Sequence, residues 1–246
     1  MFVCFEGIDG AGKTTQARML LQRLQKDGVV ATLVADPGTT QIGTAIRQIL
    51  LQNDAPISSA AQMLLFSAAR AELAAHVAAL LAADNIVICD RWLLSTLVYQ
   101  GEINNVNTDL ILKIFEATSA VQPDICFLLD LDPEEAVVRM ERRSEKPSDR
   151  YERRCIEDRQ RMRAAYLRHA QERPYAKTVH VVSAALDPLA THERICNLVY
   201  KVISHSTESK DAGHARNNDE KERTRTSTFD SQTRSPSTRK ATADRP

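Results

Sequence analysis

The segment with the clearest chemical meaning is a glycine-rich run near the start of the chain. Residues 7–14 are Gly-Ile-Asp-Gly-Ala-Gly-Lys-Thr, and they fit G-x-x-x-x-G-K-[ST] completely. Glycines let the backbone curl so that several N–H groups point at one anion, and the helix that follows adds the positive end of its dipole. The run therefore predicts a nucleoside triphosphate site formed by Gly7, Ile8, Asp9, Gly10, Ala11, Gly12, Lys13, Thr14 and Thr15.

Two side chains of this run and one later carboxylate predict a magnesium-dependent phosphoryl site. Lys13 would reach the β- and γ-phosphates of the nucleotide, and the Thr14 hydroxyl would ligate Mg²⁺. Asp90 ends an apolar strand, which is typical of the carboxylate that holds this ion directly or through water. The expected co-substrate is ATP, bound with Mg²⁺.

One pair of residues and two further arginines could bind a second, phosphorylated substrate. Phe66 and Arg70 are four residues apart, so they share one helix face, where a ring can stack on a flat base and a guanidinium can donate to its edge. The alternative is a core phenylalanine with a solvated arginine. Arg91 follows a strand and can grip an acceptor phosphate through paired N–H groups, or else pair with Asp90. Arg47 is a second candidate for the acceptor phosphate.

The elements that must position these groups alternate between strand and helix patterns. Short apolar, β-branched runs predict buried strands at Phe2–Phe5, Val29–Val34, Ile86–Cys89, Ile125–Leu131 and Thr178–Val182. Helical patterns lie between them at Lys13–Lys26, Gly43–Leu51, Ser59–Ala83, Asp109–Thr118, Pro133–Arg142, Arg153–Arg173 and Ala190–Ile203. This alternation predicts an α/β protein with the P-loop NTPase fold: a five-stranded parallel sheet with helices on both faces. Ligands of such sheets bind beyond the carboxyl ends of the strands.

Composition narrows the range of partners. The 246 residues are 43% hydrophobic and 26% charged with a formal net charge of +0, and aromatic residues make up 5%. Zero net charge and few aromatic rings argue against nucleic acid and against an anionic membrane surface. The segment from Glu72 to Ala83 is too short to span a bilayer, and no signal-peptide pattern begins the chain. We therefore expect a cytoplasmic protein with neither nucleic acid nor membrane as a partner.

The end of the chain differs in composition from the rest. After Ile203 there is no Val, Leu, Ile or Met up to Pro246. Such a segment cannot bury enough apolar surface to offset its ordering entropy. We predict one domain over residues 1–203 and a disordered tail over residues 204–246.

Among proteins with this phosphate loop, a small-molecule kinase fits best. A GTPase would carry an Asn/Thr-Lys-x-Asp segment after a late strand, and a transporter ATPase would carry Leu-Ser-Gly-Gly; neither segment occurs. The chain is also short for a multi-domain motor. The prediction at this point is phosphoryl transfer from ATP to a small molecule.

Several segments together make the chain resemble thymidylate kinases, the nucleoside monophosphate kinases that phosphorylate dTMP. They are the P-loop with Asp9, Asp90-Arg91-Trp92, residues 95–101 (Ser-Thr-Leu-Val-Tyr-Gln-Gly), residues 36–43, residues 65–70 and the arginine-rich stretch from Arg142 to Glu152. The resemblance covers about Met1 to Ser204. It implies the reaction ATP + dTMP → ADP + dTDP, within dTTP biosynthesis, and a homodimer packed through helices.

The resemblance also implies roles for particular residues. Asp9 would contact the 3′-hydroxyl of the nucleotide sugar, and Tyr99 would leave no room for a 2′-hydroxyl. Ser95 and Thr96 would line the base pocket, with thymine as the base between Phe66 and Arg70. Asp36 lies in the segment that resembles the family's Arg-Glu-Pro-Gly-Gly-Thr and is assigned to the acceptor site.

The stretch over residues 142–152 is identified as the family's lid. Some family members place an arginine inside the P-loop, whereas this chain has Gly10-Ala11 there. The charge that develops during transfer then needs another cation besides Lys13 and Mg²⁺, and the lid offers Arg142, Arg143 and Arg150. Together with Lys13 and Arg91, these are the candidate catalytic residues. Two other functions stay open: another nucleoside monophosphate or deoxynucleoside kinase, and a non-catalytic nucleotide-binding protein.

Overall fold

The computed structural model describes residues 1–52, 55–119, 121–142, 151, 154–172 and 177–204. Its chain divides into two compact units, Met1–Val199 and Tyr200–Pro246. Within the second unit only residues 200–204 are described, and they are helical. The predicted tail therefore lies, except for Ser204, outside the described residues, and the division at residue 203 stays a prediction.

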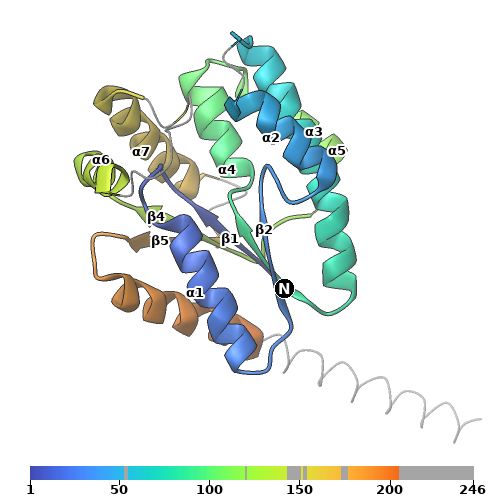
Figure 1. Cartoon of the computed structure of the whole chain (residues 1–246), viewed down its shortest axis with the longest axis vertical. Coiled ribbons are helices and arrows are strands. Elements are labelled where there is room, and N and C mark those ends of the chain that lie inside the picture. Colours follow the sequence, from blue (N-terminus) through green and yellow to red (C-terminus); the bar gives the residue numbers. More distant parts are fainter. Residues whose placement is uncertain (53–54, 120, 143–150, 152–153, 173–176, 205–246) are drawn as a thin grey trace, which may run out of the picture. The chain divides into compact units, whose positions relative to one another are not determined.

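A five-stranded parallel sheet forms the centre of the first unit, as the sequence predicts (Figure 1). Its strands are β1 (Phe2–Glu6), β2 (Ala31–Ala35), β3 (Ile86–Asp90), β4 (Ile125–Asp130) and β5 (Val179–Ser183), in the order β2-β3-β1-β4-β5. In the pairing register, Cys4 of β1 lies between Cys89 of β3 and Cys126 of β4. All residues of β1 are buried, as expected for a central strand covered on both faces.

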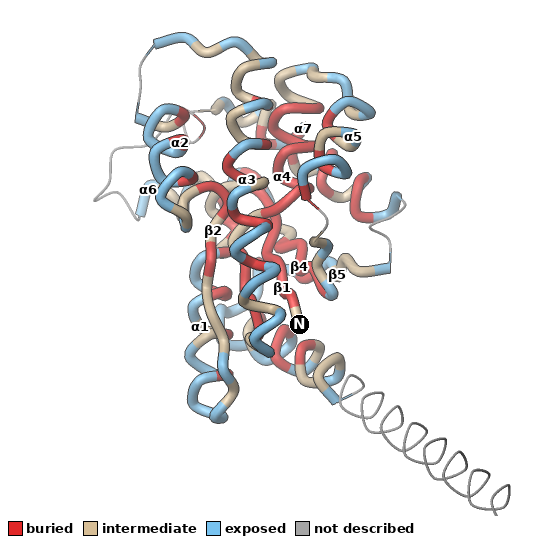
Figure 2. Tube along the Cα trace, turned by 90° about the vertical axis from the view of Figure 1, so that its right-hand side faces the viewer, coloured by how far each residue is buried: buried red, intermediate tan, exposed pale blue. Residues whose placement is uncertain are grey.

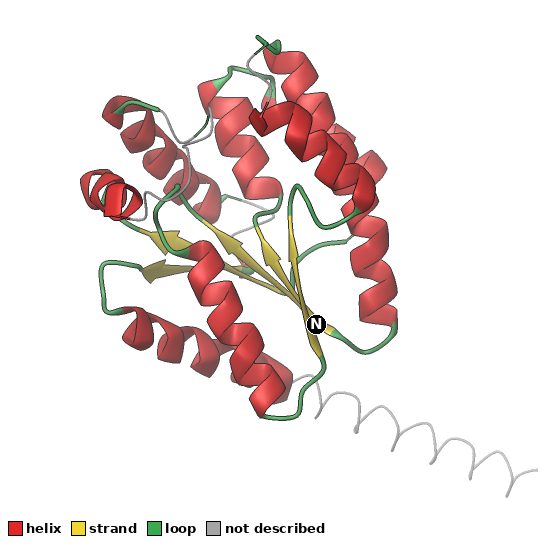
Figure 3. Cartoon of the chain, viewed as in Figure 1, coloured by secondary structure: helices red, strands yellow, loops and turns green. Residues whose placement is uncertain are grey.

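The helices cover both faces of this sheet (Figure 3). They are α1 (Lys13–Lys26), α2 (Gln41–Gln52), α3 (Ser59–Ala82), α4 (Leu93–Thr96), the π-helix η1 (Leu97–Ile103), α5 (Thr108–Thr118), α6 (Pro133–Arg142) and α7 (Ile156–Gln171); residues 188–199 are helical as well. Helix α1 packs against β1, β2 and β3, α3 packs against β3, and α7 packs against β4 and β5. Figure 2 shows buried inner strands surrounded by helices whose outer faces are exposed. The edge strands β2 and β5 are only partly buried, so the prediction of a buried strand is wrong for these two, each of which has a neighbouring strand on one side only.

Several boundaries differ from the sequence prediction by one to three residues, and two of the differences have clear reasons. Strand β2 begins at Ala31 rather than Val29, because the Val29 N–H completes the end of α1 by donating to the Leu24 carbonyl at 2.9 Å. Residues 93–103 form one helical stretch, longer than the sequence suggested, and its second part is π-helical. π-Helical turns are often found at functional sites, and this one carries Tyr99.

Helix α3 has 24 residues and is long and apolar enough to cross a membrane by length and composition alone. The segment from Glu72 to Ala83, which the sequence analysis judged too short to span a bilayer, is only the second half of this helix. Inside the fold, however, α3 packs against α2, α5 and β3, and it carries the buried Arg70. These contacts and the buried charge of Arg70 are those of a helix packed inside a folded domain.

Candidate functional site

The phosphate loop follows β1 and leads directly into α1. Its three glycines, Gly7, Gly10 and Gly12, have φ angles of +137°, +89° and +92°. A Cβ at Gly10 would also lie 2.5 Å from the backbone carbonyl oxygen of Ala136, so that position requires glycine for two independent reasons. The glycines of the motif are therefore required by the backbone conformation of the loop and, at Gly10, by its close packing.

The Lys13 side chain is buried under this loop. Its ammonium donates to the Ile8 carbonyl at 2.8 Å and lies 4.0 Å from a carboxylate oxygen of Asp9. Burial and the nearby Arg91 lower the pKa of Lys13 to about 8, although Asp9 and Asp90 act in the opposite direction. A phosphate placed in the loop would raise this pKa again and favour the protonated lysine.

Thr14 and Asp90 come together as the sequence predicts. The Thr14 hydroxyl donates to a carboxylate oxygen of Asp90 at 2.5 Å, across from β3 to the start of α1. A hydroxyl and a carboxylate beside a phosphate loop are the oxygen ligands that suit Mg²⁺, which takes only one or two protein groups and completes its shell with phosphate and water. Thr15 is exposed next to Thr14. Within the described residues there is no cluster of three or more His, Cys, Asp or Glu that could hold a metal on its own.

Arg91 links the phosphate loop to the helical stretch after β3. It adopts φ +75°, a conformation that non-glycine residues rarely hold and that is typical of functional sites. Its guanidinium pairs with Asp9, not with Asp90, and also donates to the Gly7 carbonyl at 3.2 Å. The Tyr99 hydroxyl donates to the other Asp9 oxygen at 2.7 Å.

This arrangement keeps Asp9 ionised. Burial acts to raise the pKa of Asp9, but Arg91, Lys13 and the Tyr99 hydrogen bond outweigh it and lower the pKa to about 2. Asp9 thereby orients two groups, Arg91 and Tyr99, that the resemblance assigns to the acceptor side. Its contact with the 3′-hydroxyl of a nucleotide sugar stays a prediction.

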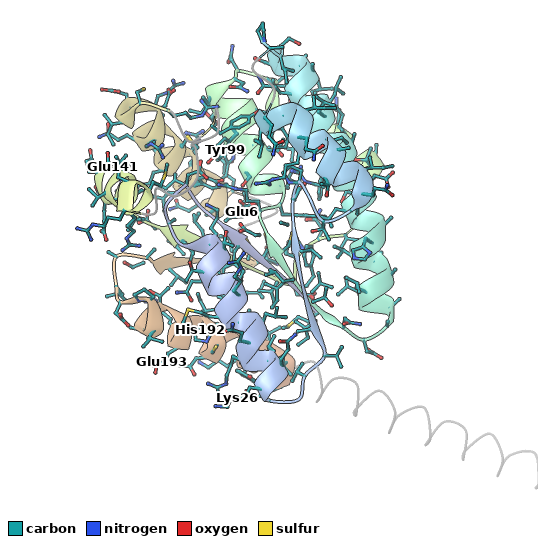
Figure 4. The ribbon with its side chains drawn as sticks, in the orientation of Figure 1. Glu6, Lys26, Tyr99, Glu141, His192 and Glu193 are labelled. Atoms are coloured by element: carbon teal, nitrogen blue, oxygen red, sulfur yellow. The ribbon has the colours of Figure 1, made fainter. Side chains whose placement is uncertain are left out.

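Glu6 is a site residue that the sequence reasoning missed. It is fully buried at the end of β1, where it accepts hydrogen bonds from the Trp92 N–H (2.8 Å), the Ser95 N–H (3.1 Å) and the Ser95 hydroxyl (2.5 Å). Figure 4 labels Glu6 and Tyr99 in the same region of the molecule. Burial raises the pKa of Glu6. The sequence signal that could have identified Glu6 as a site residue is its position as an acid at the end of an otherwise apolar strand.

Arg70 is buried, which rules out the alternative of a solvated arginine. Its Nε donates to Asp36 at 2.6 Å, and one terminal nitrogen donates to the Thr96 hydroxyl at 2.6 Å and the Trp92 carbonyl at 3.3 Å. Burial raises the pKa of Asp36, while Arg70 opposes that effect. Asp36, Arg70 and Thr96, predicted as separate substrate contacts, are one hydrogen-bonded unit here. Direct donation from Arg70 to a base stays a prediction.

The remaining acceptor-site candidates surround a group of aromatic rings. Phe66, on α3 with Arg70, lies edge-on to Tyr151 at 5.9 Å between ring centroids, and Tyr151 lies 6.1 Å from Tyr99. The Tyr151 hydroxyl donates to the side-chain oxygen of Gln62 at 2.8 Å. Tyr151 was not singled out from the sequence, because the lid was searched for arginines only.

Arg47, on α2, is one of the cations that act to lower the pKa of Asp36. Its guanidinium donates to the Pro37 carbonyl at 2.9 Å, which places it on the segment after β2. Ser95, by contrast, joins the cluster directly: Arg91 donates to its hydroxyl at 3.1 Å, and the Tyr166 hydroxyl lies 2.9 Å from it.

Of the three lid arginines, the structure describes Arg142 alone. Arg142 is the exposed last residue of α6, whereas Arg143 and Arg150 lie outside the described residues. Two other arginines come close to the site and were missed by the sequence reasoning. Arg154 lies over the Tyr99 and Tyr151 rings, and Arg159 is buried and contributes to the low pKa of Asp9.

Residues 5–195 match the family model described as thymidylate kinase. The chain belongs to the thymidylate kinase family. Among relatives of this family, the thymidylate kinase of Chlorobaculum parvum is 38% identical over 204 residues, covering 79% of this chain and 93% of the relative. That of Caldanaerobacter subterraneus subsp. tengcongensis is 34% identical, covering 82% and 96%. The crystal structure of the thymidylate kinase from Ehrlichia chaffeensis has a TM-score of 0.63 and 28% identity, covering 81% of this chain and 98% of that one.

Membership in the thymidylate kinase family confirms the resemblance and the P-loop fold predicted from the sequence. The coverage of these relatives is nearly complete, so the match is to a whole kinase domain rather than to the phosphate loop alone.

Proposed function

We propose that the chain transfers the γ-phosphoryl group of ATP to dTMP, giving ADP and dTDP. The observation that carries this proposal is the contact between Asp9 of the phosphate loop and two acceptor-side groups, Arg91 and Tyr99. One carboxylate thereby ties the donor site to the acceptor site. Phosphoryl transfer needs this kind of alignment, because positioning and charge stabilisation supply most of its catalysis.

On the donor side, Lys13 and the loop N–H groups would hold the β- and γ-phosphates, and Thr14 and Asp90 would hold Mg²⁺. The chemistry that Mg²⁺ supplies when bound is neutralisation of charge on the phosphate oxygens. On the acceptor side, Arg91 would bind the phosphate of dTMP, Phe66 would stack on the base, and the unit of Arg70, Asp36 and Thr96 would face the edge of the base.

Developing charge on the transferred group is assigned to a lid arginine, with Arg142, Arg143 and Arg150 as candidates. Replacing the one that acts in the transition state by Ala should lower kcat about a hundredfold or more, with far smaller changes in KM for ATP and dTMP. Three single variants assayed at saturating substrates distinguish them. Near-normal kcat in all three would remove the lid arginines from the mechanism.

The test of the reaction itself is ADP formation with dTMP, dUMP, dCMP, AMP and thymidine, each against a Lys13→Met control. Activity with dTMP above the other acceptors supports a thymidylate kinase reaction. Activity that peaks with a different acceptor would indicate another nucleoside monophosphate or deoxynucleoside kinase. ATP binding without ADP formation from any acceptor would indicate a non-catalytic nucleotide-binding protein.

We further propose a cytoplasmic homodimer. Exposed apolar side chains lie on the two helices α2 and α3, which pack against each other: Ile42, Ile49 and Leu64 are 53%, 46% and 55% exposed. Light scattering coupled to size exclusion tests this assembly. Leu64→Glu should yield monomers, whereas the equally conspicuous Leu189→Glu (64% exposed) should not.

A further inference from the structure

Arg154 presents a half-buried guanidinium that its surroundings satisfy only in part. Its central carbon lies 5.7 Å from the Tyr99 ring centroid and 5.6 Å from that of Tyr151. The side chain is 15% exposed, and its Nε is buried without a hydrogen-bond partner in the structure. Arg154 forms an ion pair with Asp158 at 3.8 Å, a separation that is too long for a hydrogen bond.

The position of Arg154 relative to the acceptor site follows from the ring that it shares with Arg91. The Arg91 guanidinium carbon lies 5.2 Å from the same Tyr99 centroid, so one ring contacts both guanidinium groups. Arg91 differs in being well paired, since it bonds Asp9, the Gly7 carbonyl and Ser95. Arg154 has an unused donor at the same ring.

The charges around this ring favour an anionic occupant. Asp9 is already under the influence of Arg91, Lys13 and Arg159, and Arg154 adds a further positive charge. Burying a guanidinium is costly unless a matching anion pairs with it, and cation–π contacts to two rings offset only part of that cost. A phosphate offers oxygens that match the planar fork of an arginine.

We propose that Arg154 is a second phosphate-binding residue of the acceptor site, acting beside Arg91 on the phosphate of dTMP. This inference rests on the proposed function, since it concerns the acceptor of the same reaction. It assigns the role to a residue of the segment that precedes α7, outside the three lid arginines considered above. The competing explanation is a clip that holds the Tyr99 and Tyr151 rings together by cation–π contact alone.

The two explanations differ in what they predict for a ligand without a phosphate. We would measure the Kd of dTMP and of thymidine by titration calorimetry, using the full chain and Arg154→Met. Loss of a charged hydrogen bond should weaken dTMP binding about tenfold to a hundredfold, while thymidine binding changes less than about twofold. Arg154→Lys should recover part of the dTMP affinity, because it keeps the charge but loses the fork.

A matched control is available on α7, the helix that follows Arg154. Arg161 is 62% exposed and also contacts Asp158, at 3.4 Å, so Arg161→Met removes a nearby positive charge without touching the Tyr99 ring. It should leave both affinities within about twofold of wild type.

The following results would overturn the inference. Equal affinity of wild type and Arg154→Met for dTMP would show that no phosphate contact exists, and equal losses for dTMP and thymidine would establish the structural clip. If Arg154→Met does not fold, the Lys variant decides: full retention of dTMP affinity by it overturns a role for the planar fork. Failure of wild type to bind dTMP at all would instead overturn the proposed function, and this inference with it.

Discussion

The ion pair between Arg70 and Asp36 should make Arg70 a major contributor to stability as well as a substrate-site residue. The Arg70 side chain is 5% exposed and that of Asp36 is 1% exposed, so water barely screens the pair. Arg70→Met would leave the Asp36 carboxylate buried without its cation and would also remove the bonds to Thr96 and the Trp92 carbonyl. Removing one partner of such a pair costs about 3–5 kcal/mol.

The loss of stability should be visible in the Tm of Arg70→Met and should depend on pH. For a domain of this length it corresponds to a lower Tm by roughly 6–20 °C, since 1 kcal/mol shifts Tm by about 2–4 °C. Burial raises the pKa of Asp36 above its unfolded value, and loss of Arg70 would raise it further. A raised carboxyl pKa makes the folded state more favourable as pH falls through it, so the deficit of Arg70→Met should shrink on acidification.

The assay is urea denaturation followed by circular dichroism at pH 7 and at pH 5, with Arg47→Met as the matched control. Arg47 is exposed, and its guanidinium donates to the Pro37 carbonyl at 2.9 Å, so its loss should cost less than about 1 kcal/mol. Adding Asp36→Asn to Arg70→Met should recover part of the stability, because no unpaired charge is then buried. A deficit no larger than that of the Arg47 control, or one that grows at pH 5, would refute the reasoning.

Binding measured on the same folded variant separates stability from recognition. If Arg70 also donates to the base, dTMP binding should weaken by roughly 1.5–3 kcal/mol while ATP binding stays near wild type. Equal loss for both nucleotides would leave Arg70 with a structural role alone.

The remaining predictions concern the phosphate loop and the end of the chain. Asp9→Asn should cost roughly 2 kcal/mol at pH 7, because the carboxyl pKa is held at about 2 against an ordinary 3.8; the difference from wild type should vanish in urea melts as pH falls from about 4 to about 2. ATP affinity should fall above about pH 8 as Lys13 loses its proton, and Lys13→Arg should remove that pH dependence in titration calorimetry. Gly10→Ala should abolish ATP binding, because its Cβ would meet the Ala136 carbonyl at 2.5 Å; retained affinity would show that the loop can shift. Deleting residues 205–246 should leave activity and Tm nearly unchanged, and a large loss of either would show that this segment contributes to the folded enzyme.

Local chemistry made the donor side predictable from the sequence. The phosphate loop depends on glycines at positive φ, on the helix that starts beside it and on a lysine one residue into that helix, all within eight consecutive residues. The strands were equally accessible, since buried parallel strands are continuous apolar runs. That Thr14 meets Asp90 then follows from topology, because β1 and β3 are neighbours with their carboxyl ends at one edge.

The acceptor side depended on contacts between distant residues, which side-chain type and spacing do not encode. Arg70 could be expected on one face with Phe66, but its pairing with Asp36, 34 residues away, required the packing of α3 beside β3. Glu6 looked like the end of a strand until the fold placed the Trp92 and Ser95 N–H groups around it. A buried polar group must find partners wherever the chain provides them, so tertiary packing alone decides which residue it pairs with. For the same reason Tyr151 and Arg154 gained their place beside Tyr99 only in the folded molecule.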